Sequence, residues 1–161
     1  DLPFGAVIER LAAKGDKLVD LPYTVKGMDL SFSGLLTAAT EASKSGTHRL
    51  EDVCFSLQEV AFSMLAEVTE RALAHTGKLE LLLTGGVAAN KRLQAMMKII
   101  ADEHDACFTV VPKEYALDNG AMIAWTGILA YEHGITLPLE KSMVKLKWRL
   151  DQVSVPWVEG G

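Results

Sequence analysis

The strongest pattern in the chain is a helical repeat of apolar residues between Arg49 and His75. Apolar side chains recur there every three or four positions, which places them on one face of a helix. Glu51 and Asp52 lie at the start, where acidic side chains interact favourably with the helix dipole. The pattern predicts one long helix whose apolar face is formed by Val53, Leu57, Val60, Met64, Leu65, Val68 and Leu73.

The same periodicity, in shorter segments, predicts further helices. They cover residues 4–14, 33 to about 44, about 88 to about 104, and about 118 to about 133. Gly15 follows the first of them in the position of a C-cap, and Ser33 precedes the second as an N-cap.

Two apolar runs, residues 79–84 and about 107–111, are typical of buried strands and alternate with the predicted helices. This order is characteristic of an α/β fold with a mainly parallel, covered sheet. Two parallel strands alone do not close a stable core, so the sheet must recruit further strands. Residues 17–32 are read as irregular or edge-strand chain, and residues 141–158 as a solvated edge strand or, alternatively, a basic binding strip.

Length and composition exclude several kinds of protein. A chain of 161 residues normally forms one domain. Its net charge of −5 disfavours non-specific attraction to phosphate backbones, so any RNA contact needs a local basic patch or another subunit. No apolar run approaches the ~20 residues that span a bilayer and no leader pattern opens the chain, so we expect no membrane role and a cytoplasmic location. Cys54 and Cys107 form no metal or redox motif and are expected to be free, partly buried thiols.

The most informative local motif is the Gly85-Gly86 pair, which ends the first predicted strand shortly before Asn90 and the next helix. Glycine allows the backbone to approach a phosphate or sugar closely, and a helix N-terminus supplies free N–H donors. The pattern is neither a Walker loop nor a full dinucleotide fingerprint. A nucleotide site and a plain tight turn therefore both remain open.

Other polar positions admit simpler interpretations. Asp118 begins Asp118-Asn119-Gly120, ahead of a helical apolar repeat, and is expected to cap that helix. Glu9 is expected to be a solvated side chain beside the apolar face of the first helix. Three histidines near predicted helix ends are read as caps rather than metal ligands: His75, His104 and His133.

Taken together, several segments resemble the universal family that makes threonylcarbamoyladenosine in tRNA, called TsaD in bacteria and forming the catalytic subunit of the KEOPS complex in archaea and eukaryotes. The first of the segments resembles the archaeal and eukaryotic branch. The resemblance covers almost the whole chain as a C-terminal fragment. It rests on residues 21–29, 31–34, 54–59, 84–90 and 118–124. An older glycoprotease label of the family finds no protease motif here.

The resemblance implies an actin-like, two-lobed fold of the sugar-kinase and chaperone (ASKHA) superfamily, with ATP or threonylcarbamoyl-AMP in the cleft between the lobes. Residues 1–140 would form most of the second, nucleotide-binding lobe, and residues 141–161 an extended tail. The first lobe, with its phosphate motif, would lie upstream of this chain. The fold is therefore expected to be incomplete here.

Site residues also follow from the resemblance. Gly5 and Glu9 correspond to the family's ribose contacts, although Phe4 and Ala6 stand where the family usually has a second glycine and a proline. The family's aspartate that binds iron or zinc corresponds to Asp118, while a His-x-x-x-His pair and a tyrosine that complete its metal site lie upstream. The nucleoside contacts correspond to Gly85, Gly86 and Asn90.

The implied reaction is transfer of threonylcarbamoyl from threonylcarbamoyl-AMP to the adenosine beside the tRNA anticodon. Expected partners are the missing N-terminal half of the enzyme, tRNA and KEOPS subunits that include a small kinase. The chain alone is expected to be inactive. Two other functions remain open: an ATP-dependent sugar or acyl kinase on the same superfold, and a non-catalytic partner-binding fragment.

Overall fold

A computed structural model describes residues 4–149 and 152–158. The chain divides into two compact units, Asp1–Leu117 and Asp118–Gly161, and each is described by itself. The first unit contains α1 (Phe4–Ala12), β1 (Val25–Lys26), β2 (Asp29–Leu30), α2 (Ser33–Lys44), α3 (Leu50–Thr76), β3 (Glu80–Leu83), the 3-10 helix η1 (Gly86–Ala89), α4 (Lys91–Glu103) and β4 (Cys107–Val110). The second contains α5 (Gly120–Glu132) and the 3-10 helix η2 (Leu139–Lys141). The sequence prediction of a mixed α/β fold is confirmed.

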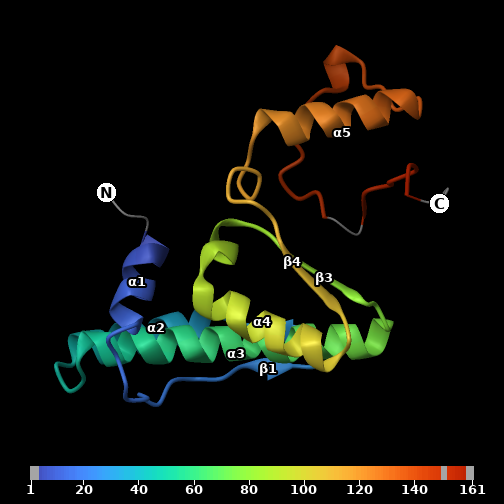
Figure 1. The fold of residues 1–161 in the computed structure, drawn as a ribbon. Helices are drawn as coiled ribbons and strands as arrows, with labels where there is room; N and C mark the ends of the chain where they lie inside the picture. The colour runs from blue at the N-terminus through green and yellow to red at the C-terminus, as the bar shows by residue number, and fades with distance from the viewer. Residues whose placement is uncertain (1–3, 150–151, 159–161) are drawn as a thin grey trace. The chain divides into compact units, whose positions relative to one another are not determined.

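The long helix α3 is the element around which the first unit is built (Figure 1). It begins after an extended Arg49 and ends at Gly77, whose left-handed φ of 61° lets its N–H bond to the Leu73 carbonyl. The predicted long helix is therefore confirmed. Its buried side chains are not confined to the predicted apolar face, because α1, α2 and α4 pack around it: Cys54, Ser56 and Phe62 are also buried.

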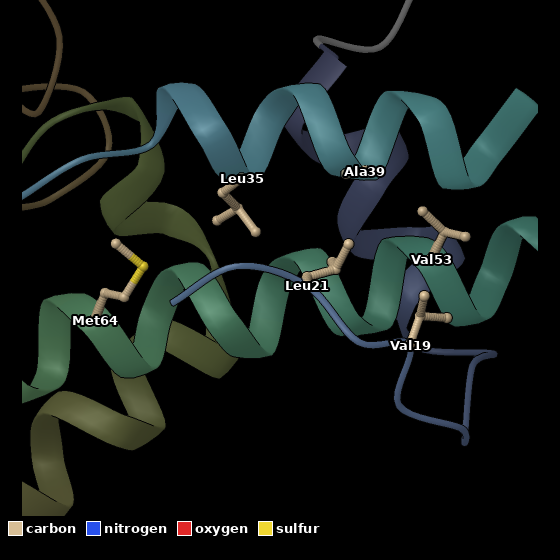
Figure 2. Packing of buried hydrophobic residues seen from close by; sticks show 6 residues of the cluster. All are labelled: Val19, Leu21, Leu35, Ala39, Val53 and Met64. Carbon is tan, nitrogen blue, oxygen red and sulfur yellow. The ribbon is translucent and has the colours of Figure 1, made fainter. Parts of the chain in front are cut away.

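Two apolar clusters lie on different sides of α3. Figure 2 shows the first, where α2, α3 and the chain leading to β1 meet; its buried members are Val19, Leu21, Leu35, Ala39, Val53 and Met64. The second lies between α3 and α4 and contains Phe62, Leu73, Leu93, Met97 and Ile100. Each large apolar side chain contributes roughly 1.5–3 kcal/mol when fully buried. Together the clusters fix α2 and α4 against α3.

β3 and β4 pair in parallel, with Glu80 opposite Cys107 and Leu83 opposite Val110, as the strand-helix-strand order predicts. One face of the pair, which carries Leu81, packs towards the second apolar cluster. Leu82 on the other face is 62% exposed. Parallel sheets are normally covered on both faces, so this two-stranded sheet has the character of part of a larger one.

Residues 17–32 form the antiparallel pair β1–β2, in which Val25 lies opposite Leu30 and Gly27 turns the chain with a φ of 63°. The pair does not join β3 and β4. The region was predicted to be irregular or edge-strand chain, and it is irregular apart from this short hairpin.

Both predicted caps in the first unit are wrong. Gly15 does not adopt the left-handed conformation of a C-cap. Instead, a Cβ atom there would lie 2.7 Å from the Cβ of Phe55, so glycine is required because the chain passes close to α3. Ser33 is the first residue of α2 rather than its N-cap, which is Phe32 and makes no side-chain cap bond.

In the second unit, α5 begins one residue later than a cap at Asp118 would require. The N-cap is Asn119, whose side-chain oxygen accepts the Met122 N–H at 2.9 Å, and Asp118 precedes it as an exposed residue. The prediction that Asp118 caps this helix is therefore wrong. Asn fills the cap because its oxygen can reach the backbone N–H three residues ahead.

The tail does not form the expected edge strand: the described part of residues 141–158 consists of turns and irregular chain. Lys145 Nζ lies 4.6 Å from the centre of the Trp148 ring, which is a cation–π arrangement. The capping prediction is confirmed for His104 and His133, which are the C-cap residues of α4 and α5, whereas His75 lies in the last turn of α3 and Gly77 is the C-cap there. Cys54 is a free buried thiol as expected, but Cys107 is exposed.

Within the described ranges, no helix combines the length and apolar character needed to cross a membrane.

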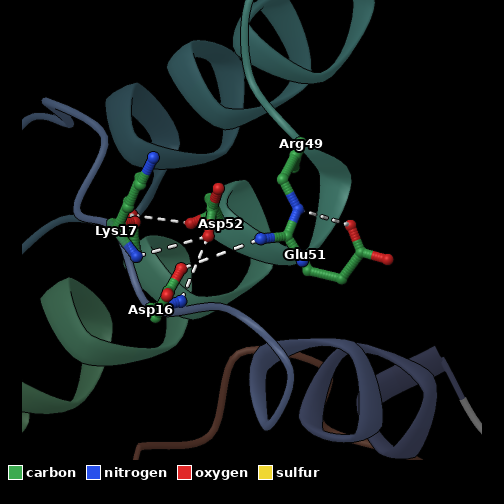
Figure 3. Close-up of polar contacts among 6 residues, drawn as sticks. Asp16, Lys17, Arg49, Glu51 and Asp52 are labelled. Carbon is green, nitrogen blue, oxygen red and sulfur yellow. Dashed lines mark hydrogen bonds and ion pairs between the residues drawn. The ribbon is translucent and has the colours of Figure 1, made fainter.

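The loop after α1 is tied to α3 by a buried carboxylate (Figure 3). Oδ1 of Asp52 accepts the backbone N–H groups of Asp16 and Lys17, at 3.1 and 3.3 Å. These bonds, that of Asp16 first, hold the pKa of Asp52 below its ordinary value. One turn later, the Ser56 hydroxyl accepts the Val19 N–H at 2.7 Å. The loop therefore depends on α3 for its backbone hydrogen bonds.

Replacing Asp52 should lower the stability of the chain at neutral pH, with Asp52→Ala more damaging than Asp52→Asn, because asparagine keeps one acceptor oxygen. The lowered pKa means that the unfolded chain binds more protons than the folded chain in acid. Asp52 therefore contributes its full stabilisation above its unfolded pKa of about 3.9. This stabilisation is lost as the pH falls through the lower pKa of the folded chain. Urea unfolding at about pH 7 and about pH 3 should show a smaller acid-induced loss for Asp52→Asn than for the wild type.

The matched control is Glu51→Gln, which removes the neighbouring carboxylate and its 3.9 Å contact with Arg49. Such a partly exposed ion pair contributes about 0–1 kcal/mol, so this variant should resemble the wild type. If acid lowered the free energy of unfolding of Asp52→Asn as much as that of the wild type, the acid-sensitive stability could not be assigned to Asp52.

Candidate functional site

The chain turns sharply at Gly85, immediately beyond the carboxyl end of β3. Its φ of 97° and ψ of 173° are open to glycine and strained for other residues. The 3-10 helix η1 follows, and α4 then begins at Lys91. The single helix expected from about residue 88 is thus interrupted, because Asn90 adopts an extended conformation and caps a separate α4.

A pocket of about 500 Å³ lies at the carboxyl ends of both parallel strands. Gly85 and Gly86 form one side of it, and the chain from Val110 to Leu117 forms the other. Lys91 and Lys113 also contribute to the wall, and among the residues that the structure describes no Asp or Glu lines the pocket. Its size and charge suit a small anionic ligand, at the strand ends where open α/β sheets bind ligands.

Asn90 uses both ends of its side-chain amide within the chain. Its Oδ1 accepts the backbone N–H groups of Arg92 and Leu93, at 2.9 and 3.2 Å. Its Nδ2 donates to Oε1 of Gln58 on α3 at 3.0 Å. An amide nitrogen carries two N–H groups, so one donor of Asn90 is available beyond this bond.

Glu9 does not behave as the solvated side chain that its place on the first helix suggests. Its Oε1 accepts the backbone N–H of Lys91 at 3.0 Å, although 82 residues separate the two in the sequence. The structure therefore brings Glu9 beside Asn90 at the start of α4. Gly5 lies one turn before Glu9 on α1, is exposed, and has open space where a Cβ would project.

Asp118 belongs to the second unit and is exposed. Across the part of the chain that the structure describes, no group of three His, Cys, Asp or Glu side chains is placed to hold a metal ion. Asp118 offers one hard oxygen donor, which suits iron or zinc but cannot hold either alone. An iron or zinc site would need donors that these residues do not supply.

Gln58 of α3 contacts Asn90, although no local pattern in the sequence marks it as a site residue. The next residue, Glu59, lies outside the site and forms a two-point ion pair with Arg92, with Nε–Oε1 and Nη2–Oε2 distances of 2.8 and 2.7 Å. The carboxylate raises the pKa of Arg92.

These features define a class: an α/β protein with a glycine turn, a capped helix and a cationic pocket at the carboxyl end of its parallel strands. The comparisons identify the family. The chain belongs to the TsaD family, tRNA N6-adenosine threonylcarbamoyltransferase, whose model matches residues 1–125.

Archaeal relatives agree with this assignment. The chain is 58% identical to a tRNA N6-adenosine threonylcarbamoyltransferase of Archaeoglobus fulgidus, over 96% of this chain and 48% of that protein. It is 54% identical to the enzyme of the same name from Thermococcus kodakarensis, with the same two coverages. A probable bifunctional tRNA threonylcarbamoyladenosine biosynthesis protein of Methanocaldococcus jannaschii is 57% identical over 98% of this chain and 29% of its own length. The chain thus spans less than half the length of these curated relatives.

Two changes at Asn90 should separate capping from ligand contact. In the full-length protein, Asn90→Asp keeps an oxygen for the two N–H groups of α4 but loses the Nδ2 donor. It should retain near-normal stability and bind ATP roughly 3- to 10-fold more weakly. Asn90→Ala should also lose about 1 kcal/mol of stability with the cap. Thermal melting and isothermal titration calorimetry give the two values, and unchanged ATP affinity in Asn90→Asp would exclude the contact.

Proposed function

We propose that this chain is the second-lobe portion of a tRNA N6-adenosine threonylcarbamoyltransferase. The observation that carries the proposal is the combination of the family match over residues 1–125 with archaeal relatives at 54–58% identity, each covering more than nine tenths of the chain. The complete enzyme transfers threonylcarbamoyl from threonylcarbamoyl-AMP to the adenosine beside the anticodon. The adenosine amine forms the new bond to the carbamoyl carbon, and AMP leaves.

The proposed architecture is an actin-like, two-lobed ASKHA fold, with residues 1–140 in the second lobe and residues 141–161 as its tail. The exposed face of the β3–β4 pair supports this, because a parallel sheet of two strands needs further strands or helices to cover it. The relatives are long enough to contain a first lobe as well.

For the nucleotide we propose the pocket at the carboxyl ends of β3 and β4. Gly85 and Gly86 form its wall. Asn90 lies at the adjoining helix start, and Glu9 is held beside it by the bond to Lys91. The backbone N–H groups at the start of α4 are already bonded to Glu9 and Asn90, so the two lysines of the wall supply the positive charge that favours an anion. Gly5, one turn from Glu9, completes the proposed set for ATP or threonylcarbamoyl-AMP.

Asp118 is proposed as one ligand of an iron or zinc ion whose remaining ligands come from the part of the enzyme outside this chain. When bound, such an ion would act as a Lewis acid towards the oxygens of the substrate. The residues described here have separate tasks, which are to bind the nucleoside and orient it. No side chain of this chain is assigned as a nucleophile.

The proposed partners are tRNA, the N-terminal half of the same enzyme and KEOPS subunits that include a small kinase. With a net charge of −5, the chain has no general attraction for tRNA. Binding of tRNA therefore depends on local basic surfaces or on the other subunits. A tRNA substrate agrees with the cytoplasmic location expected from the sequence.

The chain by itself should bind ATP weakly and should not transfer threonylcarbamoyl, because the ligands of the site are divided between two halves. Misplacement of reacting groups by about 1 Å already costs on the order of 100-fold in rate, and the loss of one wall costs at least as much. An assay of transfer from radiolabelled threonylcarbamoyl-AMP to tRNA, run on the chain with and without the upstream half, measures this. Full turnover by the chain alone, or nucleotide-dependent phosphorylation of a sugar by the complete protein, would contradict the proposal.

Asp118→Asn in the full-length protein should lose bound metal and transfer activity at nearly unchanged melting temperature, because Asn119 rather than Asp118 caps α5. Metal content by inductively coupled plasma mass spectrometry, melting temperature and transfer rate are measured together. Glu114→Gln, a change at an exposed carboxylate four residues earlier, serves as the control and should keep all three values. Retained metal in Asp118→Asn would remove Asp118 from the proposed metal site.

A further inference from the structure

The side-chain amide of Asn90 is held in a single orientation by groups on two sides. Its Oδ1 receives two backbone N–H groups of α4. Its Nδ2 faces Oε1 of Gln58, at 3.0 Å in a partly buried contact. Rotating the amide by half a turn would place N–H against N–H at the helix start, so the backbone N–H groups of α4 select this orientation. The oxygen of Gln58 then holds the Nδ2 end of the amide in place.

The selected orientation leaves one N–H group of Asn90 beyond the bond to Gln58. Because α4 fixes the oxygen and Gln58 fixes the first N–H, the direction of the second N–H is also set. A donor whose direction is fixed in advance loses little freedom when a ligand accepts its bond.

Gln58 is not needed to attach α4 to α3. The two helices are already joined by the two-point ion pair between Glu59 and Arg92. They are also joined by the apolar cluster that contains Phe62 and Leu93. A further hydrogen bond from Gln58 adds little to this attachment, whereas it is the bond that orients the Asn90 amide.

We propose that Gln58 is a positioning residue of the nucleoside site: it accepts one N–H of Asn90 and thereby directs the other towards the bound nucleoside. The inference rests on the proposed function, since it takes Asn90 as a nucleoside contact. Gln58 itself touches no ligand in this proposal and acts only through Asn90.

The test uses the full-length protein, with ATP as the probe and calorimetric affinity as the readout. Gln58→Leu, similar in size but without an acceptor, should weaken ATP binding roughly 3- to 10-fold. Gln58→Glu keeps an acceptor oxygen and should bind ATP nearly as the wild type does. Glu59→Gln on the same turn is the matched control: it weakens the pair with Arg92 and should lower the melting temperature while leaving ATP affinity unchanged.

A double-mutant cycle with Asn90 separates positioning from a general structural role. In the Asn90→Asp background, which keeps the helix cap, Gln58→Leu should cause no further loss of ATP affinity. Wild-type affinity in Gln58→Leu, or the same loss in both backgrounds, would overturn the proposal.

The outcomes also distinguish this inference from the proposed function. A wild-type protein that binds ATP but transfers no threonylcarbamoyl to tRNA would refute the proposed reaction. The ATP affinities of the Gln58 variants would still test the positioning role. A wild-type protein that binds no ATP would remove the nucleoside site and the role of Gln58 with it.

Discussion

The first unit depends on one constraint: α3 is packed on several sides at once. α2 covers one side of it and α4 another, and the loop after α1 takes its backbone hydrogen bonds from Asp52 and Ser56. Because α3 is common to these contacts, it sets the positions of α1 and α4 relative to each other. Glu9 on α1 therefore reaches the first N–H of α4, although 82 residues separate them. The geometry of the candidate site is thus a consequence of helix packing on α3.

Elements with strong local signals could be predicted from the sequence, whereas their ends could not. The apolar repeat of α3 and the parallel pair β3–β4 follow from periodicity and order alone. Caps depend on finer geometry. Asp118 and Asn119 are adjacent and chemically similar, and only the backbone path shows that Asn119 reaches the N–H of Met122. Gly15 resembles a C-cap in sequence, but its role is set by the close approach of Phe55 from a distant helix.

Some residues of the candidate site could likewise be predicted from the sequence, whereas others could not. Gly85, Gly86 and Asn90 lie within six residues, so a strand that ends in two glycines before a helix is enough to suggest them. The contact of Glu9 with α4 is invisible to any local pattern, because it exists only once both helices are packed on α3. Gln58 was missed for a related reason: a polar residue on a long helix is usually solvated, and its partner lies 32 residues away.

Each of the two units, taken by itself, leaves apolar surface exposed. α5 is apolar around its circumference and has no buried residue, with Trp125 61% and Tyr131 74% exposed. Helices of this composition are buried in their complete proteins, and the same holds for the face of a parallel sheet that carries Leu82. Relatives about twice as long as the chain contain further protein that could cover such surfaces. The first lobe that we propose would meet two needs at once, because it would cover exposed apolar surface and would supply the missing ligands of the proposed metal site.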